Sequence, residues 1–221
     1  MNRLLMIAIA AGSLLPAAAQ DRFDLKVRNF FFTGFSGDRE SLEQGMKMCE
    51  EELAVRPKNA EALVWHGAGL YFQSGQFFQK GDPQHGMELW QRGMKEMDLA
   101  VELAPDRVGV RIPRGAALFA GSRFLPDPEM AKPLIVKAIS DYEKSYEVQS
   151  ATLDKLGVHP RGELLIGMAD GYARLGNKEK ASALYAQIEQ DVPGSVYSRK
   201  AALFKENGAP QGGCLGCHAA K

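Results

Sequence analysis

Apolar residues recur at steps of about four along most of the chain. From residue 24 to about residue 206, no strand-like alternation of any length interrupts this pattern. Residues four apart lie on one face of an α-helix, whereas a half-buried strand alternates every second residue. The pattern therefore predicts an all-α domain over residues 20–206.

The helical pattern also repeats. A small residue is followed four and eight positions later by larger apolar residues, and twelve positions later by proline. The small residue lets a neighbouring helix approach closely, and the proline ends the helix because it has no backbone N–H. The two matching runs are Gly45-Cys49-Leu53-Pro57 and Gly93-Met97-Val101-Pro105, and a looser third run is Gly176-Ala181-Tyr185-Ile188-Pro193.

These runs resemble the tetratricopeptide repeat family. The match is good over 161–193 and over the second helices of the first two repeats, and poor around 120–158. The resemblance implies antiparallel helical hairpins stacked as a solenoid, whose concave face often binds peptides or partner proteins in that family. A generic all-α bundle is the alternative. Pro57 and Pro105 are 48 residues apart, whereas the repeat is about 34 residues long, which indicates an insertion at roughly 74–85. The implied hairpins are at about 24–57, 59–105, 107–150 and 161–193, with a closing helix at about 195–206.

The first twenty residues differ from the rest of the chain. Arg3 precedes an apolar run, Leu4 to Leu15, and Ala17-Ala18-Ala19 offers small residues for cleavage before Gln20. This pattern is typical of a signal peptide, here residues 1–19. A short membrane anchor is the alternative, but spanning needs about 20 apolar residues. We expect export to the periplasm or an equivalent compartment, with no integral membrane span after cleavage.

The balance of basic and acidic residues indicates which class of partner the chain can bind. The chain has 27 basic and 27 acidic residues among 221. A nucleic-acid-binding protein normally carries a basic excess or a basic stripe. We therefore expect no nucleic-acid partner.

The C-terminal residues 207–221 form a turn-rich linker and a tail that carries a cysteine motif. The motif is Cys214-Leu215-Gly216-Cys217-His218, the attachment signature of c-type haem. Two thiols three positions apart can each form a thioether to a haem vinyl group, and His218 then supplies the proximal iron ligand. We expect one covalent haem c per chain on a flexible tail. A redox dithiol, a zinc site and a tail without function are the alternatives.

Two histidines are candidates for the other axial position of the iron. His159 lies in Leu156-Gly157-Val158-His159-Pro160, which indicates a loop from which the imidazole is free to reach out. His85 follows Phe77 and Phe78, which could cover a porphyrin. The alternative for each is an ordinary surface histidine.

Cys49 and His66 occupy positions in the repeated helical pattern at which side chains pack between helices. Cys49 is expected to be a buried, unreactive thiol. His66 precedes Gly67 and is expected to be structural rather than a ligand.

The primary functional expectation is a non-enzymatic electron-transfer module that docks to a redox partner. The chain has no phosphate-binding loop, zinc-protease motif or nucleophile elbow. A scaffold whose groove binds a protein or peptide is the first alternative. A peroxidase-like enzyme with an open iron position is the second.

Overall fold

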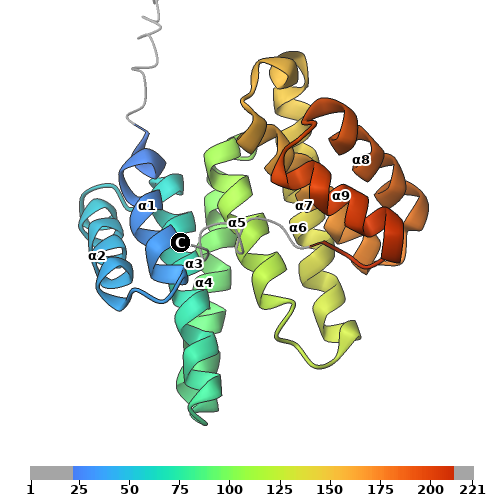
Figure 1. Cartoon of the computed structure of the whole chain (residues 1–221). Helices are drawn as coiled ribbons and strands as arrows, with labels where there is room; N and C mark the ends of the chain where they lie inside the picture. Colours follow the sequence, from blue (N-terminus) through green and yellow to red (C-terminus); the bar gives the residue numbers. More distant parts are fainter. Residues whose placement is uncertain (1–21, 212–221) are drawn as a thin grey trace, which may run out of the picture.

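A computed structural model describes residues 22–211, and all regular structure in this range is helical. The all-α prediction is therefore confirmed for the described part of the chain. Figure 1 shows the elements in order. They are α1 (Phe23–Phe35), α2 (Arg39–Val55), α3 (Ala60–Gln79), α4 (Pro83–Leu103), α5 (Val108–Gly121), α6 (Pro128–Gln149), the 3₁₀-helix η1 (Ser150–Lys155), α7 (Val158–Arg174), α8 (Lys178–Asp191) and α9 (Val196–Asn207).

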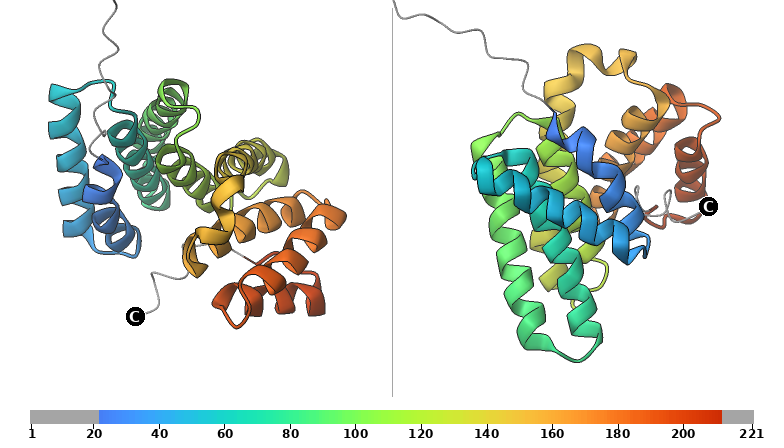
Figure 2. Two further views of the ribbon diagram at one scale, coloured as in Figure 1. Left: turned by 90° about the horizontal axis from the view of Figure 1, so that it is seen from above. Right: turned by 90° about the vertical axis from the view of Figure 1, so that its left-hand side faces the viewer.

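Consecutive helices pack in pairs. The pairs are α1 with α2, α3 with α4, α5 with α6, and α7 with α8, and α9 packs on α8. Neighbouring pairs meet through α3 against α1, α2 and α5, and through α6 against α7. The two views in Figure 2 show the pairs following one another across the molecule.

Polar caps and glycines explain where many helices begin and end. The side chain of the residue before α2, α3, α4, α6, α8 and α9 accepts a hydrogen bond from a backbone N–H of the first turn. Such a cap satisfies a donor that has no partner within the helix. Gly208 ends α9 in the left-handed conformation, with a φ of 66°, which glycine adopts without steric cost.

Residues 74–85, where the resemblance implies an insertion, include the end of α3 and the start of α4. The helix α3 has 20 residues and α4 has 21, and only a short turn at residues 80–82 separates them. In Figure 1 this hairpin projects beyond its neighbours.

The close helix contact predicted from the glycines is present. A Cβ atom at Gly67 would lie 2.7 Å from the carbonyl oxygen of Gly93, so α3 and α4 touch backbone to backbone there. Cys49 is fully buried, and burial raises the pKa of its thiol far above the ordinary value. His66 is also buried, with Nδ1 2.5 Å from the Glu96 carboxylate. The expected burial of Cys49 and the packed position of His66 are thus confirmed.

Within residues 22–211, no helix combines the length and apolar character needed to cross a membrane.

Candidate functional site

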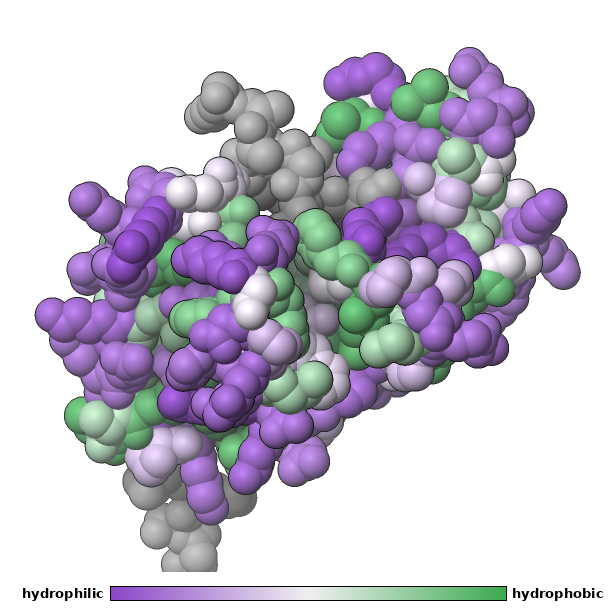
Figure 3. Space-filling view, turned by 90° about the horizontal axis from the view of Figure 1, so that it is seen from below, coloured by the Kyte–Doolittle hydropathy of each residue, from purple (hydrophilic) through white to green (hydrophobic). Residues whose placement is uncertain are grey.

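A large cleft lies along the inner faces of α1, α3 and α5 and extends to α6 and α7. Its volume is about 1910 Å³, whereas ordinary small-molecule pockets measure about 300–1,000 Å³. Figure 3 shows hydrophobic side chains bordering the hollow between two halves of this face. The cleft is therefore large enough for a cofactor, a peptide or part of a partner protein.

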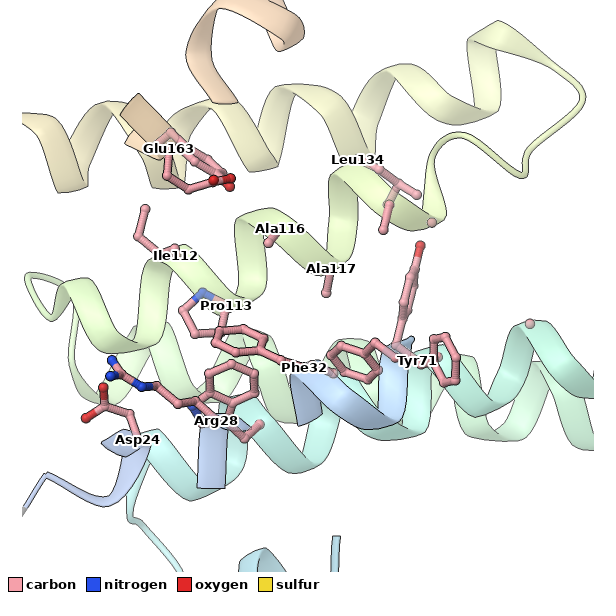
Figure 4. Close-up of a pocket in the computed structure, with 18 of the residues that line it drawn as sticks. Asp24, Arg28, Phe32, Tyr71, Ile112, Pro113, Ala116, Ala117, Leu134 and Glu163 are labelled. Carbon is pink, nitrogen blue, oxygen red and sulfur yellow. The ribbon is translucent and has the colours of Figure 1, made fainter. Parts of the chain in front are cut away.

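The middle of the cleft is aromatic and aliphatic. Phe32 from α1 and Trp65 from α3 pack edge to face, with ring centroids 5.7 Å apart. Figure 4 shows Phe32 opposite Pro113 and Ile112 of α5, with Tyr71 farther along the same wall. Such a surface suits a large apolar ligand, because covering it removes apolar area from water.

One end of the cleft is polar. Glu61 of α3 accepts a hydrogen bond from the backbone N–H of Asp24 at 3.0 Å and lies 2.8 Å from the Arg107 guanidinium. Asp24 is paired with Arg22, with 2.7 Å between oxygen and nitrogen. These contacts join the start of α1 to α3 and to the start of α5. In Figure 4, Arg28 lies at the same end, and Glu163 of α7 lies across the cleft.

At this polar end, His159 is part of a hydrogen-bonded relay. Its Nδ1 lies 2.6 Å from the Tyr197 hydroxyl, and that hydroxyl donates to Glu163 Oε2 at 3.0 Å. Tyr197 and Glu163 are buried, whereas His159 is exposed and lines the cleft. The loop prediction for His159 is wrong: the residue is in the first turn of α7. Pro160 is tolerated there because an N–H in the first turn has no helical partner.

The opposite end of the cleft exposes apolar side chains. Phe78 is 40% exposed, Met87 45%, Phe124 78% and Met130 59%, and all four line the cleft. We call these four residues the apolar rim. Phe78 and Met87 come from the long α3–α4 hairpin, Phe124 from the segment that joins α5 to α6, and Met130 from the first turn of α6. Exposed apolar clusters commonly mark interaction surfaces.

Among residues 22–211, two buried polar atoms in the cleft wall have neither a hydrogen bond nor an ion pair. They are Nε1 of Trp65 and Oε1 of Glu163. A buried polar group without a partner costs about 1–3 kcal/mol. Both atoms therefore favour a ligand that offers an acceptor to the indole and a donor to the carboxylate.

His85 lies outside the cleft lining, in the first turn of α4. Its Nδ1 is 2.6 Å from the Asp82 carboxylate, and this hydrogen bond raises the pKa of His85 above its ordinary value. Its ring also packs against Phe77, with centroids 5.7 Å apart. Phe77 is thus in contact with His85, whereas Phe78 is part of the apolar rim.

The expected haem-attachment residues Cys214, Cys217 and His218 lie outside the described residues, as does the expected signal peptide. The described chain ends at Gln211, whose backbone N–H donates to the Tyr185 hydroxyl at 3.0 Å. The described chain therefore ends beside α8, three positions before Cys214 in the sequence.

The described residues fit a haem as a covering surface. The aromatic middle of the cleft could cover a porphyrin face, and His159 offers an imidazole at its edge. Among residues 22–211, no cluster of three or more His, Cys, Asp or Glu side chains could hold a metal ion by itself. A haem needs no such cluster, because the porphyrin supplies the equatorial ligands.

Sequence reasoning missed Tyr197 and Glu163. Glu163 is four residues after His159, so both lie on one face of α7. That spacing could have indicated a shared site only if this segment had been predicted as a helix. Tyr197 comes from α9, 38 residues along the chain from His159, and no local pattern links the two.

Comparisons with known proteins return no family model, no curated protein and no solved structure that matches this chain.

Proposed function

We propose that this chain is an exported electron-transfer protein whose helical domain carries one covalent haem c on its C-terminal tail. Cys214 and Cys217 form the thioethers, and His218 is the proximal iron ligand. When bound, the haem supplies an iron centre that can accept and release one electron. The sequence Cys214-Leu215-Gly216-Cys217-His218 is the observation that carries this proposal.

The proposal includes a tetratricopeptide-repeat-like stack for the helical domain. The paired packing of α1 to α8, the terminal position of α9 and the Gly67–Gly93 contact support this arrangement. A terminal helix that covers the last pair is a common feature of repeat arrays.

The large cleft supports a haem-carrying role because a haem left in water would expose a wide apolar surface. Covering that surface is favourable by roughly 25 cal/mol per Å². The described domain offers an aromatic surface for this purpose in the same chain. The apolar rim, at the end opposite His159, then provides a docking surface for a redox partner.

The test is covalent haem content in cells that have haem-maturation machinery. The exported protein is denatured, separated by electrophoresis and stained for haem, and the same band is assayed as a pyridine haemochrome. We expect staining in the natural chain and none in the double variant Cys214→Ser/Cys217→Ser. A chain that is exported and folded but colourless contradicts the proposal.

A protein-interaction scaffold is the second candidate function. The unpaired Trp65 Nε1 and Glu163 Oε1, together with the apolar rim, favour a bound peptide or partner protein. Deleting residues 208–221 separates the two functions. If a partner complex and the cellular phenotype survive this deletion, the scaffold is the main function.

A peroxidase-like activity requires an open iron position. It is tested by a high-spin ferric spectrum that changes on addition of peroxide. The electron-transfer proposal predicts a low-spin spectrum and no such change.

A further inference from the structure

We infer that the cleft binds an amphiphilic small molecule whose cationic head contacts Glu163 and whose apolar chain lies along α5 toward the apolar rim. The head carries N–H donors, as a primary ammonium group does. This ligand is separate from the haem of the proposed function, and residues 22–211 alone form its site.

Three buried acidic residues line the cleft, and one of them has no cation beside it. Asp24 pairs with Arg22 and Glu61 pairs with Arg107. Glu163 is 7% exposed and forms no ion pair within residues 22–211. Burying a charge is costly unless the charge is paired. A positively charged group on the ligand would supply the missing partner.

The two oxygens of Glu163 differ in their partners. Oε2 accepts a hydrogen bond from the Tyr197 hydroxyl at 3.0 Å, whereas Oε1 is buried without a hydrogen bond. Figure 4 shows the carboxylate directed into the space between α7 and α5. The last torsion of a glutamate side chain is broad, so a small rotation brings Oε1 to the cleft surface. An ionised carboxylate only accepts hydrogen bonds, so the ligand must offer a donor.

A cationic head with N–H donors meets both requirements of Glu163. It brings the positive charge and the donor together, and a hydrogen bond to an ionised partner is about twice as strong as a neutral one. A quaternary ammonium group brings the charge without a donor, whereas an amide brings a donor without the charge. The three kinds of head should therefore differ in affinity.

The side of α5 that lines the cleft provides a path for an apolar chain. Figure 4 shows Ile112, Ala116 and Ala117 one after another along α5, starting at the end of the cleft where Glu163 lies. From Ile112 to Gly121, the last residue of α5, the helix rises about 14 Å. The apolar rim lies beyond this end. Each methylene that is buried on this path should tighten binding by up to about fourfold.

Trp65 adds a requirement for the body of the ligand. Its Nε1 is buried in the cleft wall without a hydrogen bond, and an indole N–H only donates. An acceptor within the ligand, such as an amide carbonyl, would satisfy it. The expected ligand therefore has an acceptor between its apolar chain and its cationic head.

The first test varies the head of the ligand. A series of amphiphiles shares a dodecanamide chain and carries a primary ammonium, its neutral N-acetyl form, a trimethylammonium or a carboxylate. Binding to the exported full-length protein is measured by isothermal titration calorimetry below the micelle concentration. We expect the primary amine to bind about tenfold or more tightly than the other three, and to bind more weakly when the chain is shortened to decanamide. Equal affinity for all four heads overturns the inference.

The second test compares Glu163→Gln with Asp106→Asn. Glu163→Gln removes the charge and keeps an oxygen that can accept from Tyr197. Asp106→Asn removes a charge from a 70% exposed side chain that also lines the cleft. We expect Glu163→Gln to weaken binding of the primary amine by about tenfold or more and to leave the N-acetyl form unchanged, whereas Asp106→Asn changes neither. No loss in Glu163→Gln, or an equal loss in both variants, overturns the inference.

The path of the chain is tested by Ala116→Phe. Ala116 is half-buried and lines the cleft, so a phenyl ring there fills the path. We expect every amphiphile of the series to bind more weakly, whatever its head, while circular dichroism shows a folded protein. Unchanged affinities in a folded Ala116→Phe protein show that the chain does not lie along α5, which contradicts the inference.

Other occupants and the proposed function give distinguishable results. A peptide that binds the natural protein but not Ala116→Phe, while no amphiphile binds, assigns the cleft to a partner protein and overturns the inference. The variant Cys214→Ser/Cys217→Ser keeps every residue of the site, so we expect it to bind the primary amine. Absence of covalent haem in the natural chain contradicts only the proposed function, and amine binding that is independent of Glu163 contradicts only this inference.

Discussion

The backbone N–H of Gln211 donates a hydrogen bond to the Tyr185 hydroxyl, with 3.0 Å between the two atoms. This contact fastens the last described residue to α8, three positions before Cys214. Tyr185 also stacks on Phe204 of α9, with ring centroids 4.1 Å apart. One tyrosine therefore joins the end of the helical domain to the start of the tail.

The Tyr185 hydroxyl makes the fold sensitive to alkaline pH. Burial raises the pKa of Tyr185 to about 12, above the ordinary tyrosine value of 10.0. A raised pKa means that the folded state favours the neutral hydroxyl. The stabilisation is complete below pH 10 and is lost as pH rises toward 12.

We expect urea unfolding to give a free energy that falls across this alkaline range. The fall should be smaller in Tyr185→Phe, which has no hydroxyl to ionise. An identical pH profile for the two proteins would contradict the role given to this hydroxyl. Amide hydrogen exchange at Gln211 should be faster in Tyr185→Phe at neutral pH, because its N–H loses the hydroxyl acceptor.

The contact between Gly67 and Gly93 predicts that α3 does not tolerate a side chain at residue 67. An added Cβ would lie 2.7 Å from the backbone oxygen of Gly93, which cannot move without shifting α4. We expect Gly67→Ala to lower the free energy of unfolding by about 1–3 kcal/mol.

The matched control is Gly75→Ala on the same helix. A Cβ at Gly75 meets nothing within 4 Å, and alanine favours a helix over glycine by about 1 kcal/mol. Gly75→Ala should therefore be neutral or stabilising in chemical denaturation. Equal effects of the two substitutions would show that the close helix approach does not matter.

A buried ion pair holds α5 against α6. The fully buried Asp141 carboxylate accepts bonds from Arg114 at 2.7 Å to each oxygen and from Arg111 at 2.9 Å. Asp141→Asn removes the negative charge and leaves the buried Arg114 without its main partner. Breaking a buried pair in this way typically costs about 3–5 kcal/mol.

The control for Asp141→Asn is Asp106→Asn. The Asp106 side chain is 70% exposed and pairs with Lys144, and an exposed pair contributes at most about 1 kcal/mol. We expect thermal and urea unfolding to show a clearly larger loss of stability in Asp141→Asn than in Asp106→Asn. A small effect at Asp141 would mean that the buried pair contributes little to the packing of α5 on α6.

Cys49 should be inert in the folded protein. It is buried, and its raised thiol pKa leaves almost no reactive thiolate at neutral pH. We expect no alkylation of Cys49 by iodoacetamide in the native state and complete alkylation in denaturant, followed by mass spectrometry. Rapid labelling of the native protein would show that the α2 region opens locally.

Much of the helical architecture was predictable from sequence because its signals are local. The proline after each apolar run marks a helix end, and the small residues at Gly67 and Gly93 mark a close contact between helices. Capping residues such as Asp38 and Asn59 lie directly before the helices they begin. Each of these signals acts within a few residues along the chain.

The cleft and its polar end were not predictable in the same way. The cleft residues come from helices that include α1, α3, α5, α6 and α7, and Tyr197 comes from α9. These helices meet only after the helix pairs have packed. Gly157 and Pro160 flank His159 and predict a loop, yet both residues are compatible with the start of α7. Its partner Tyr197 lies on another helix, so the relay depends on tertiary packing.

The central claim is that Cys214 and Cys217 carry a covalent haem outside the cytoplasm. The most direct measurement is the intact mass of the denatured exported protein from cells with haem-maturation machinery. The account predicts a mass equal to the chain cleaved after residue 19 plus one haem, with Cys49 as the single alkylatable thiol. A mass equal to the bare chain, with Cys214 and Cys217 both alkylatable after reduction, would contradict it.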